Sequence, residues 1–140
     1  MTRRTTLLAA SLLLLAGQLP LLAHHSFSAE FDAAKPIKIR GVVTKVEWSN
    51  PHTHFYVDAR TENGEPINWE LELGSPNMLH REGWSRDSLK PGDHVTVDAF
   101  LAKDGSKLAN VRDIRMPDGR RVYIGLAGRN IPPLGTVPTP

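Results

Sequence analysis

Two alternating stretches joined by a short loop constrain the fold of this chain more than any other feature. The stretches THFYVDAR (residues 53–60) and INWELEL (residues 67–73) alternate polar and apolar side chains, which is typical of half-buried strands. The loop ENG between them suits a three-residue hairpin in which Gly64 takes the left-handed conformation. A two-residue Asn-Gly loop would set Val57 opposite Glu70, whereas the three-residue loop keeps all apolar side chains on one face. The apolar pairs that it predicts are Phe55 with Leu71 and Val57 with Trp69.

The opposite face of the same hairpin gathers polar side chains. The register sets Tyr56 opposite Glu70 and His54 opposite Glu72, so we expect an imidazole to lie beside a carboxylate. Two carboxylates on one strand can carry out acid–base chemistry when they are buried, but a face of this kind is more often solvated.

The remaining patterns predict a small β-rich domain. Residues 37–48 are expected to form a first strand that bends through a bulge at Gly41, where its apolar phase slips. A short helix should follow the hairpin, with Ser75 as its cap and Gly83 at its end. Strands in HVTVDAFL and KLANVRDIRM come next. Three strands, a helix and two strands predict a mainly β fold, a five-stranded barrel of the oligonucleotide/oligosaccharide-binding (OB) type, with an open β-sandwich as the alternative.

The first 23 residues have the three parts of a secretory signal. Arg3 and Arg4 precede an apolar run that is too short to span a bilayer comfortably, and Ala23 offers a small residue at the cleavage point. We therefore expect a bacterial protein of the periplasm or the secreted fraction, with no membrane span after cleavage. The predicted organisation is a signal peptide (1–23), an extended N-terminal segment (24–36), a β-barrel domain (37–124) and a flexible Gly/Pro-rich tail (125–140).

Composition excludes several classes of function. The chain has no cysteine, which excludes disulfides, thiolate metal sites and covalent haem attachment. Two of the 17 Lys and Arg residues lie in the predicted signal, so 15 remain against 15 Asp and Glu. The mature chain is then neutral and has no electrostatic reason to bind nucleic acid.

Short motifs spread over nearly the whole mature chain carry a family resemblance. They are HHSFSAEFD, GVVTKVEWSNPH, ELGSP, GWSRDSLKPGD, KDGSKLANVR and PDGR. Together they make the chain similar to a family of small exported bacterial proteins that is catalogued only as a domain of unknown function. The resemblance implies secretion and a single small β-rich domain, and it implies no established activity.

The adjacent histidines at the predicted cleavage point suggest a metal site. Cleavage after Ala23 would give His24 a free α-amine beside its imidazole, and a metal can displace the protons of both groups at neutral pH. A third nitrogen from His52 or His54 would complete a site suited to Cu(II), with Glu72 orienting His54. His25 is a further candidate ligand. The alternative is that His24 and His25 are exposed polar residues at the junction.

These residues predict a binding protein and not an enzyme, with copper or another divalent metal as its ligand. The rival hypothesis is a metal-free module that binds a peptide, a glycan or a protein partner in the periplasm. Its ligand face would include Trp48, Tyr56, Glu70 and Glu72. An oxidative copper enzyme is a third option, for which the sequence identifies no substrate.

Overall fold

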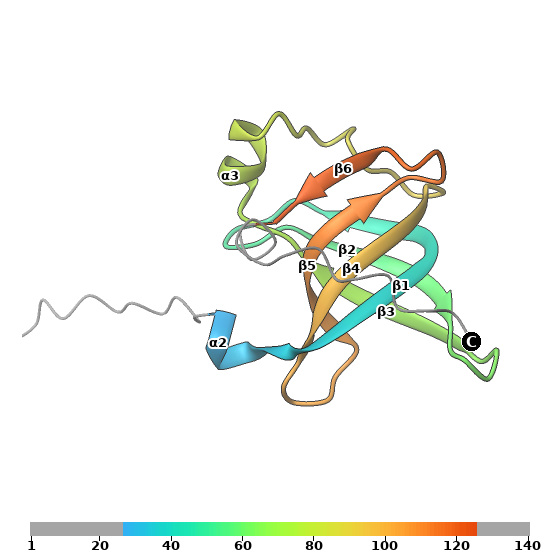
Figure 1. Ribbon diagram of the computed structural model, residues 1–140. Coiled ribbons are helices and arrows are strands. Elements are labelled where there is room, and N and C mark those ends of the chain that lie inside the picture. Colours follow the sequence, from blue (N-terminus) through green and yellow to red (C-terminus); the bar gives the residue numbers. More distant parts are fainter. Residues whose placement is uncertain (1–26, 126–140) are drawn as a thin grey trace, which may run out of the picture.

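The computed structural model describes residues 27–125 of the chain (Figure 1). Most of this part of the chain is β-strand, and both helices are short. The elements are α2 (Phe27–Glu30), β1 (Phe31–Glu47), β2 (His54–Arg60), β3 (Pro66–Glu72), α3 (Pro76–Arg81), β4 (His94–Ala102), β5 (Leu108–Arg115) and β6 (Arg121–Ile124).

The strands form one sheet in the order β3–β2–β1–β4–β5–β6. A parallel pairing of β3 with β5 closes five strands into a ring, and β6 extends the sheet beyond β5. The mainly β class, the barrel-like ring of five strands and the helix between the third and fourth strands are thus confirmed. An open sandwich of two sheets is not what forms, and β6 is a sixth strand beyond the five that the sequence predicts.

The hairpin of β2 and β3 has the register expected from its apolar pattern. The Thr61 N–H group donates to the Glu65 carbonyl oxygen over 2.9 Å, which closes a three-residue loop. Gly64 in that loop has a φ angle of +82°, as the loop type requires. The observed apolar pairs are Phe55 with Leu71 and Val57 with Trp69.

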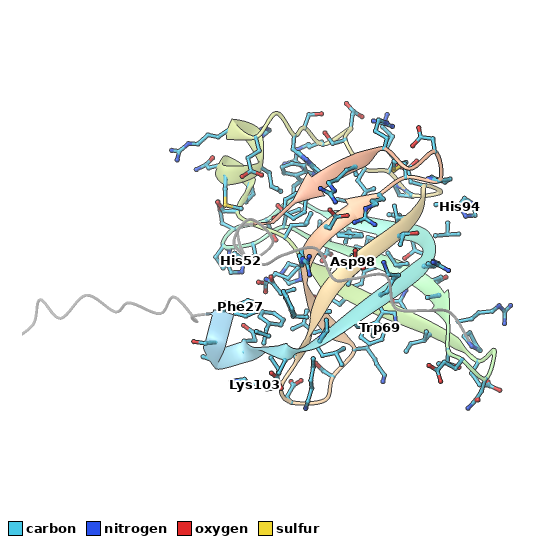
Figure 2. All side chains as sticks on the ribbon, in the orientation of Figure 1. Phe27, His52, Trp69, His94, Asp98 and Lys103 are labelled. Carbon is cyan, nitrogen blue, oxygen red and sulfur yellow. The ribbon has the colours of Figure 1, made fainter. Side chains whose placement is uncertain are left out.

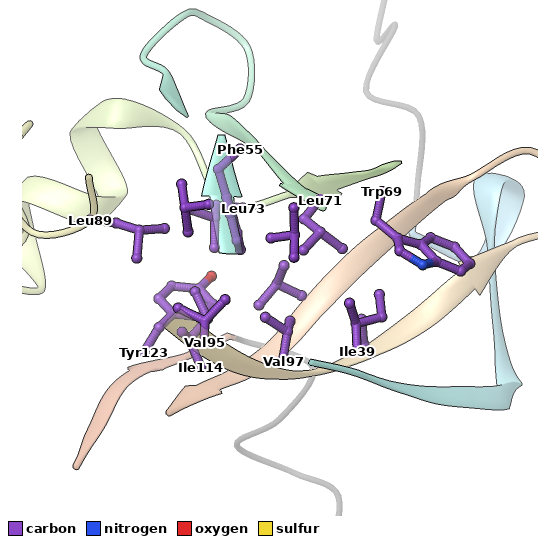
Figure 3. Close-up of a cluster of buried hydrophobic side chains, with 14 of the residues drawn as sticks. Ile39, Phe55, Trp69, Leu71, Leu73, Leu89, Val95, Val97, Ile114 and Tyr123 are labelled. Atoms are coloured by element: carbon purple, nitrogen blue, oxygen red, sulfur yellow. The ribbon is translucent and has the colours of Figure 1, made fainter. Parts of the chain in front are cut away.

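Apolar side chains from all six strands fill the interior of the ring (Figure 3). Helix α3 adds Leu79, which is fully buried. Its cap is the predicted one, since the Ser75 hydroxyl oxygen accepts a hydrogen bond from the Met78 N–H group. Each large aliphatic or aromatic side chain buried here stabilises the fold by about 1.5–3 kcal/mol. The largest fully buried hydrophobic side chains are Phe55, Leu71, Leu79, Ile114, Val43, Val57, Val97 and Val111.

Strand β1 begins earlier than the predicted start at residue 37. It starts at Phe31, which is buried and pairs with Ala102 of β4. Phe27 of α2 packs on Phe31 and on Phe100, with ring centroids 5.7 Å apart in both pairs. Most of the predicted N-terminal segment is therefore joined to the ring as strand and helix.

Gly41 is needed for a close approach of strands and not for the predicted bulge. At this residue β1 pairs with both β2 and β4, and a Cβ atom would lie 2.1 Å from the Asp58 carbonyl oxygen. The bulge lies further along, where the register with β2 shifts between Val43 and Lys45. Before the shift the inward-facing residues of β1 have odd numbers, the last of them being Val43. After the shift the inward-facing apolar residue is Val46, which has an even number. The prediction of a bulge at Gly41 is wrong because the extra residue enters three positions later.

The helices at residues 27–30 and 76–81 are both too short to cross a bilayer, and residues 27–125 contain no helix that is long and apolar enough to do so.

Candidate functional site

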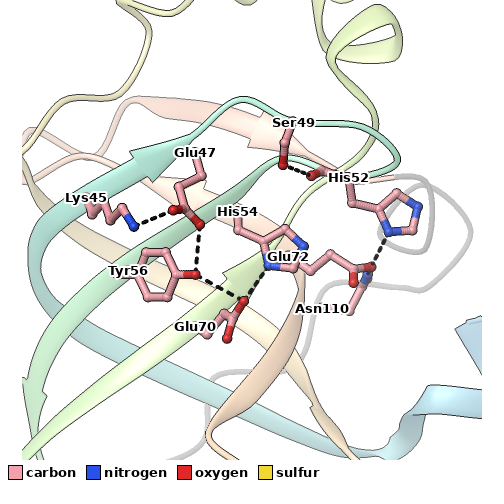
Figure 4. Close-up of polar contacts among 9 residues, drawn as sticks. All are labelled: Lys45, Glu47, Ser49, His52, His54, Tyr56, Glu70, Glu72 and Asn110. Carbon is pink, nitrogen blue, oxygen red and sulfur yellow. Dashed lines mark hydrogen bonds and ion pairs between the residues drawn. The ribbon is translucent and has the colours of Figure 1, made fainter.

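Strand β2 carries a row of polar side chains on the outer face of the ring (Figure 4). The β2–β3 ladder continues past His54, because the Thr53 N–H donates to the Gly74 carbonyl (3.0 Å) and the Leu73 N–H donates to the Thr53 carbonyl (2.8 Å). Thr53 itself is fully buried. Since side chains alternate along an extended strand, His52 and His54 both lie on the outer face.

His54 contacts the carboxylate of Glu70 and not that of Glu72. The backbone register sets His54 opposite Glu72, as predicted, but its Nδ1 atom lies 2.8 Å from Glu70 Oε1. This contact is diagonal across the two strands, which is within the reach of long side chains. The prediction that Glu72 orients His54 is therefore wrong, and Glu70 has that role.

Glu72 contacts His52 instead. Its Oε1 atom lies 3.2 Å from His52 Nδ1 and accepts a hydrogen bond of 3.1 Å from Asn110 Nδ2. The Glu72 side chain is only 8% exposed, whereas that of His52 is 38% exposed. A largely buried carboxylate is thus held by two partners, one of which faces the solvent.

The two histidine–glutamate pairs share one chemical consequence. In both pairs Nδ1 of the imidazole is the ring atom that lies next to a glutamate Oε1 atom. A neutral ring that donates a hydrogen bond through Nδ1 to such a carboxylate keeps the lone pair on Nε2. In metalloproteins, a carboxylate next to one ring nitrogen orients a histidine that binds the metal through its other nitrogen.

Tyr56 connects the His54 pair to a second carboxylate on β1. Its hydroxyl lies 3.0 Å from Glu47 Oε2 and 3.2 Å from Glu70 Oε1, and donates its proton to this pair of acceptors. Glu47 is also paired with Lys45, and the hydrogen bonds from Lys45 and then Tyr56 lower the pKa of its carboxyl group. Burial, followed by the hydrogen bond to Glu47 and the charge of Glu70, raises the pKa of Tyr56 to about 12. The phenol therefore stays neutral and acts as a donor.

This raised pKa predicts how the tyrosine absorbance titrates. The chain has two tyrosines, so the difference between the native protein and its Tyr56→Phe variant isolates Tyr56. We expect this difference to titrate near pH 12 instead of near pH 10. Because the folded pKa is raised, the stabilising contribution is complete below about pH 10 and is lost as the pH rises through 12. A difference titration centred near pH 10 would contradict these contacts.

The described part of the chain begins at Phe27, whose label in Figure 2 lies on the same side of the view as that of His52. Phe27 packs edge-on against Phe100, with ring centroids 5.7 Å apart. Phe100 is the cross-strand partner of Asn110, which in turn donates to Glu72. Ring packing, a backbone pairing and a hydrogen bond thus connect Phe27 through Phe100 and Asn110 to the Glu72–His52 pair.

Trp48 lies apart from these pairs, on the side of helix α3. Its ring stacks on that of His80 at a centroid distance of 5.4 Å, and Arg86 lies 6.0 Å from its centroid. Its buried Nε1 atom has no hydrogen-bond partner among residues 27–125. The ring partners of Trp48 are therefore His80 and Arg86. The candidate ligands His24 and His25 lie outside the described residues.

Three members of the polar face were not predicted. Lys45 and Glu47 reach it because the bulge in β1 reverses the alternation of side chains after Val43. Asn110 reaches it because β5 closes the ring and sets Asn110 beside Glu72. In the sequence, the order of elements, which is typical of an OB barrel, is what indicates that the ring closes. This order does not show that Asn110 lies beside Glu72.

The described residues do not complete a metal site by themselves. Nowhere between residues 27 and 125 do three His, Asp or Glu side chains converge on one metal position. His52 and His54 can each supply one nitrogen, so further ligands would have to come from elsewhere in the chain.

A family model described as a family of unknown function (DUF6152) matches residues 12–110. The chain therefore belongs to this family. Neither the curated proteins nor the solved structures include a significant match to it.

Proposed function

We propose that this DUF6152 member is an exported, non-enzymatic protein that binds Cu(II) through the N-terminus of its mature chain. Residues 1–23 would act as the secretory signal, and cleavage after Ala23 would free the α-amine of His24. His24 would then supply two nitrogens, with a third from His52 or His54, and His25 is an additional candidate ligand.

The observation that carries this proposal is the orientation of His52 and His54. Both rings face the same side of β2 and turn Nδ1 to a glutamate, which leaves Nε2 for a metal. The acidic side chains of Glu70 and Glu72 favour the binding of a metal cation to the neighbouring imidazole rings. Imidazole and amine nitrogens are ligands well suited to Cu(II).

The position of Phe27 supports His52 as the third ligand. His24 stands three residues before Phe27, so the intervening chain spans at most about 11 Å. The neighbours Phe100, Asn110 and Glu72 lead from Phe27 to the ion pair with His52, whereas Glu72 shares with His54 only a backbone pairing. The buried Glu72 would fix the His52 ring, and Glu70 would do the same for His54.

Replacing the two glutamates separately tests which histidine binds the metal. We expect Glu72→Gln to weaken Cu(II) affinity about 10- to 100-fold, because an uncharged amide holds the His52 ring less firmly. The same change at Glu70 should have a smaller effect. Affinity would be measured by competition with a chromophoric chelator.

The control is Glu65→Gln, at an exposed glutamate that follows the hairpin loop and has no side-chain ion pair among residues 27–125. It removes the same charge and should leave the affinity within about twofold. If Glu70→Gln gave the larger loss, His54 would be the ligand. If neither substitution differed from the control, the two pairs would not hold a metal-binding ring.

A further inference from the structure

A second polar surface lies on the outer face of β1, β4, β5 and β6. Here the cross-strand register places three arginines and a threonine in one row over four neighbouring strands. Arg40 of β1 pairs with Thr96 of β4, Thr96 pairs with Arg115 of β5, and Arg115 pairs with Arg121 of β6. Partners in such a row share a face, so these side chains lie next to one another.

Carboxylates beneath this row neutralise only part of its charge. Asp98 and Asp113 are buried, with relative exposures of 7% and 5%. Lys38 and the row supply four cations against these two carboxylates, which leaves a surplus of two positive charges. The ion pairs are Lys38–Asp98 at 2.9 Å, Arg115–Asp98 at 3.6 Å, Arg115–Asp113 at 3.0 Å and Arg121–Asp113.

A cleft lies next to Arg40, the arginine of the row that has no ion pair within the described chain. Its volume is about 580 Å³, and it is lined by Arg40, Gly41, His94, Val95, Thr96 and Pro117. Within the described chain, the side chains of Arg40, His94 and Thr96 make no hydrogen bond or ion pair. A guanidinium, an imidazole and a hydroxyl group are thus all available to a ligand in this cleft.

We propose that this cleft binds a phosphate monoester group. A phosphate monoester carries a charge of about −1.5 to −2 at neutral pH, which complements the unpaired guanidinium of Arg40 on a surface with an excess of positive charge. Its oxygens accept several hydrogen bonds, and guanidinium groups bind phosphate in a bidentate manner. Arg40 binds the phosphate, and His94 and Thr96 add donors from β4.

Calorimetric titration of the mature full-length chain with glycerol 3-phosphate tests this site. We expect saturable binding of one ligand, weakened at least about tenfold by Arg40→Gln and about threefold by His94→Gln. Both positions are exposed, so these variants should fold, and circular dichroism checks this. The control is Arg81→Gln on α3, at an exposed arginine without an ion pair in the described part, which should bind within twofold of the native chain.

Two further titrations identify the ligand class and its source. The dicarboxylate succinate should bind at least tenfold more weakly than glycerol 3-phosphate. Binding to phosphatidic acid vesicles that is lost in the Arg40→Gln variant would show that lipid head groups also supply the phosphate. Binding to the soluble ester alone would show that the source is a free metabolite. Absence of saturable binding to both phosphate probes, equal binding of succinate, or an unchanged affinity in Arg40→Gln would overturn the proposal.

Discussion

Adding one residue before His24 of the mature chain is expected to weaken Cu(II) binding at least ~100-fold. The extra residue turns the α-amine of His24 into an amide, which no longer binds the metal as an amine, and moves the new amine away from the imidazole. The loss of a direct ligand should exceed the 10- to 100-fold effect that is typical of removing a residue that only orients a ligand. His24→Ala keeps the amine and removes the imidazole, so it should also weaken binding strongly.

The matched control carries the same extra residue after Pro140, which changes the mass equally and leaves His24 as the first residue. All chains would be produced with defined first residues and compared in one competition assay against a chelator. Equal affinity of the N-terminally extended chain and this control would show that the N-terminus takes no part in binding.

Gly41→Ala is expected to destabilise the fold by about 3 kcal/mol or more. The added Cβ atom would lie 2.1 Å from the Asp58 carbonyl oxygen and 2.6 Å from Val57 Cγ1, and both atoms belong to the neighbouring strand. To relieve this contact, β1 and β2 would have to move apart at a residue where β1 also pairs with β4. The free energy of unfolding would be measured by urea denaturation.

A second glycine separates this steric effect from the general cost of replacing glycine. Gly64 has a φ angle of +82°, but a Cβ atom there would meet nothing within 4 Å. Gly64→Ala should therefore cost only about 1 kcal/mol, the cost of a left-handed conformation at a residue with a side chain. Similar losses at the two positions would contradict the close strand approach at Gly41.

Much of the fold was predictable because its strongest signals are local. The three-residue loop with Gly64 fixes the β2–β3 register, and Ser75 caps α3 as its sequence predicts. The start of β1 at Phe31 was not predicted, since Phe31 pairs with Ala102 and Phe27 packs on Phe100, both far along the chain.

In the polar face, too, the features set by neighbouring residues in the sequence were predictable, and those that depend on distant parts of the chain were not. The register predicts that His54, Tyr56, Glu70 and Glu72 share one face, which is what the β2–β3 pairing gives. It does not predict the diagonal contacts, because strand twist decides which glutamate each histidine meets. Asn110 and Glu47 could not be assigned to the site without the ring closure and the bulge of β1.

The most direct test of the proposed function is Cu(II) titration of the chain exported and cleaved by a bacterial host, read by electron paramagnetic resonance. Intact mass would first establish that the purified chain begins at His24. The proposal predicts one tightly bound Cu(II) per chain, with a spectrum that shows at least three nitrogen ligands. Weak binding, or a spectrum without nitrogen coupling, on a chain that begins at His24 would contradict the metal-binding function.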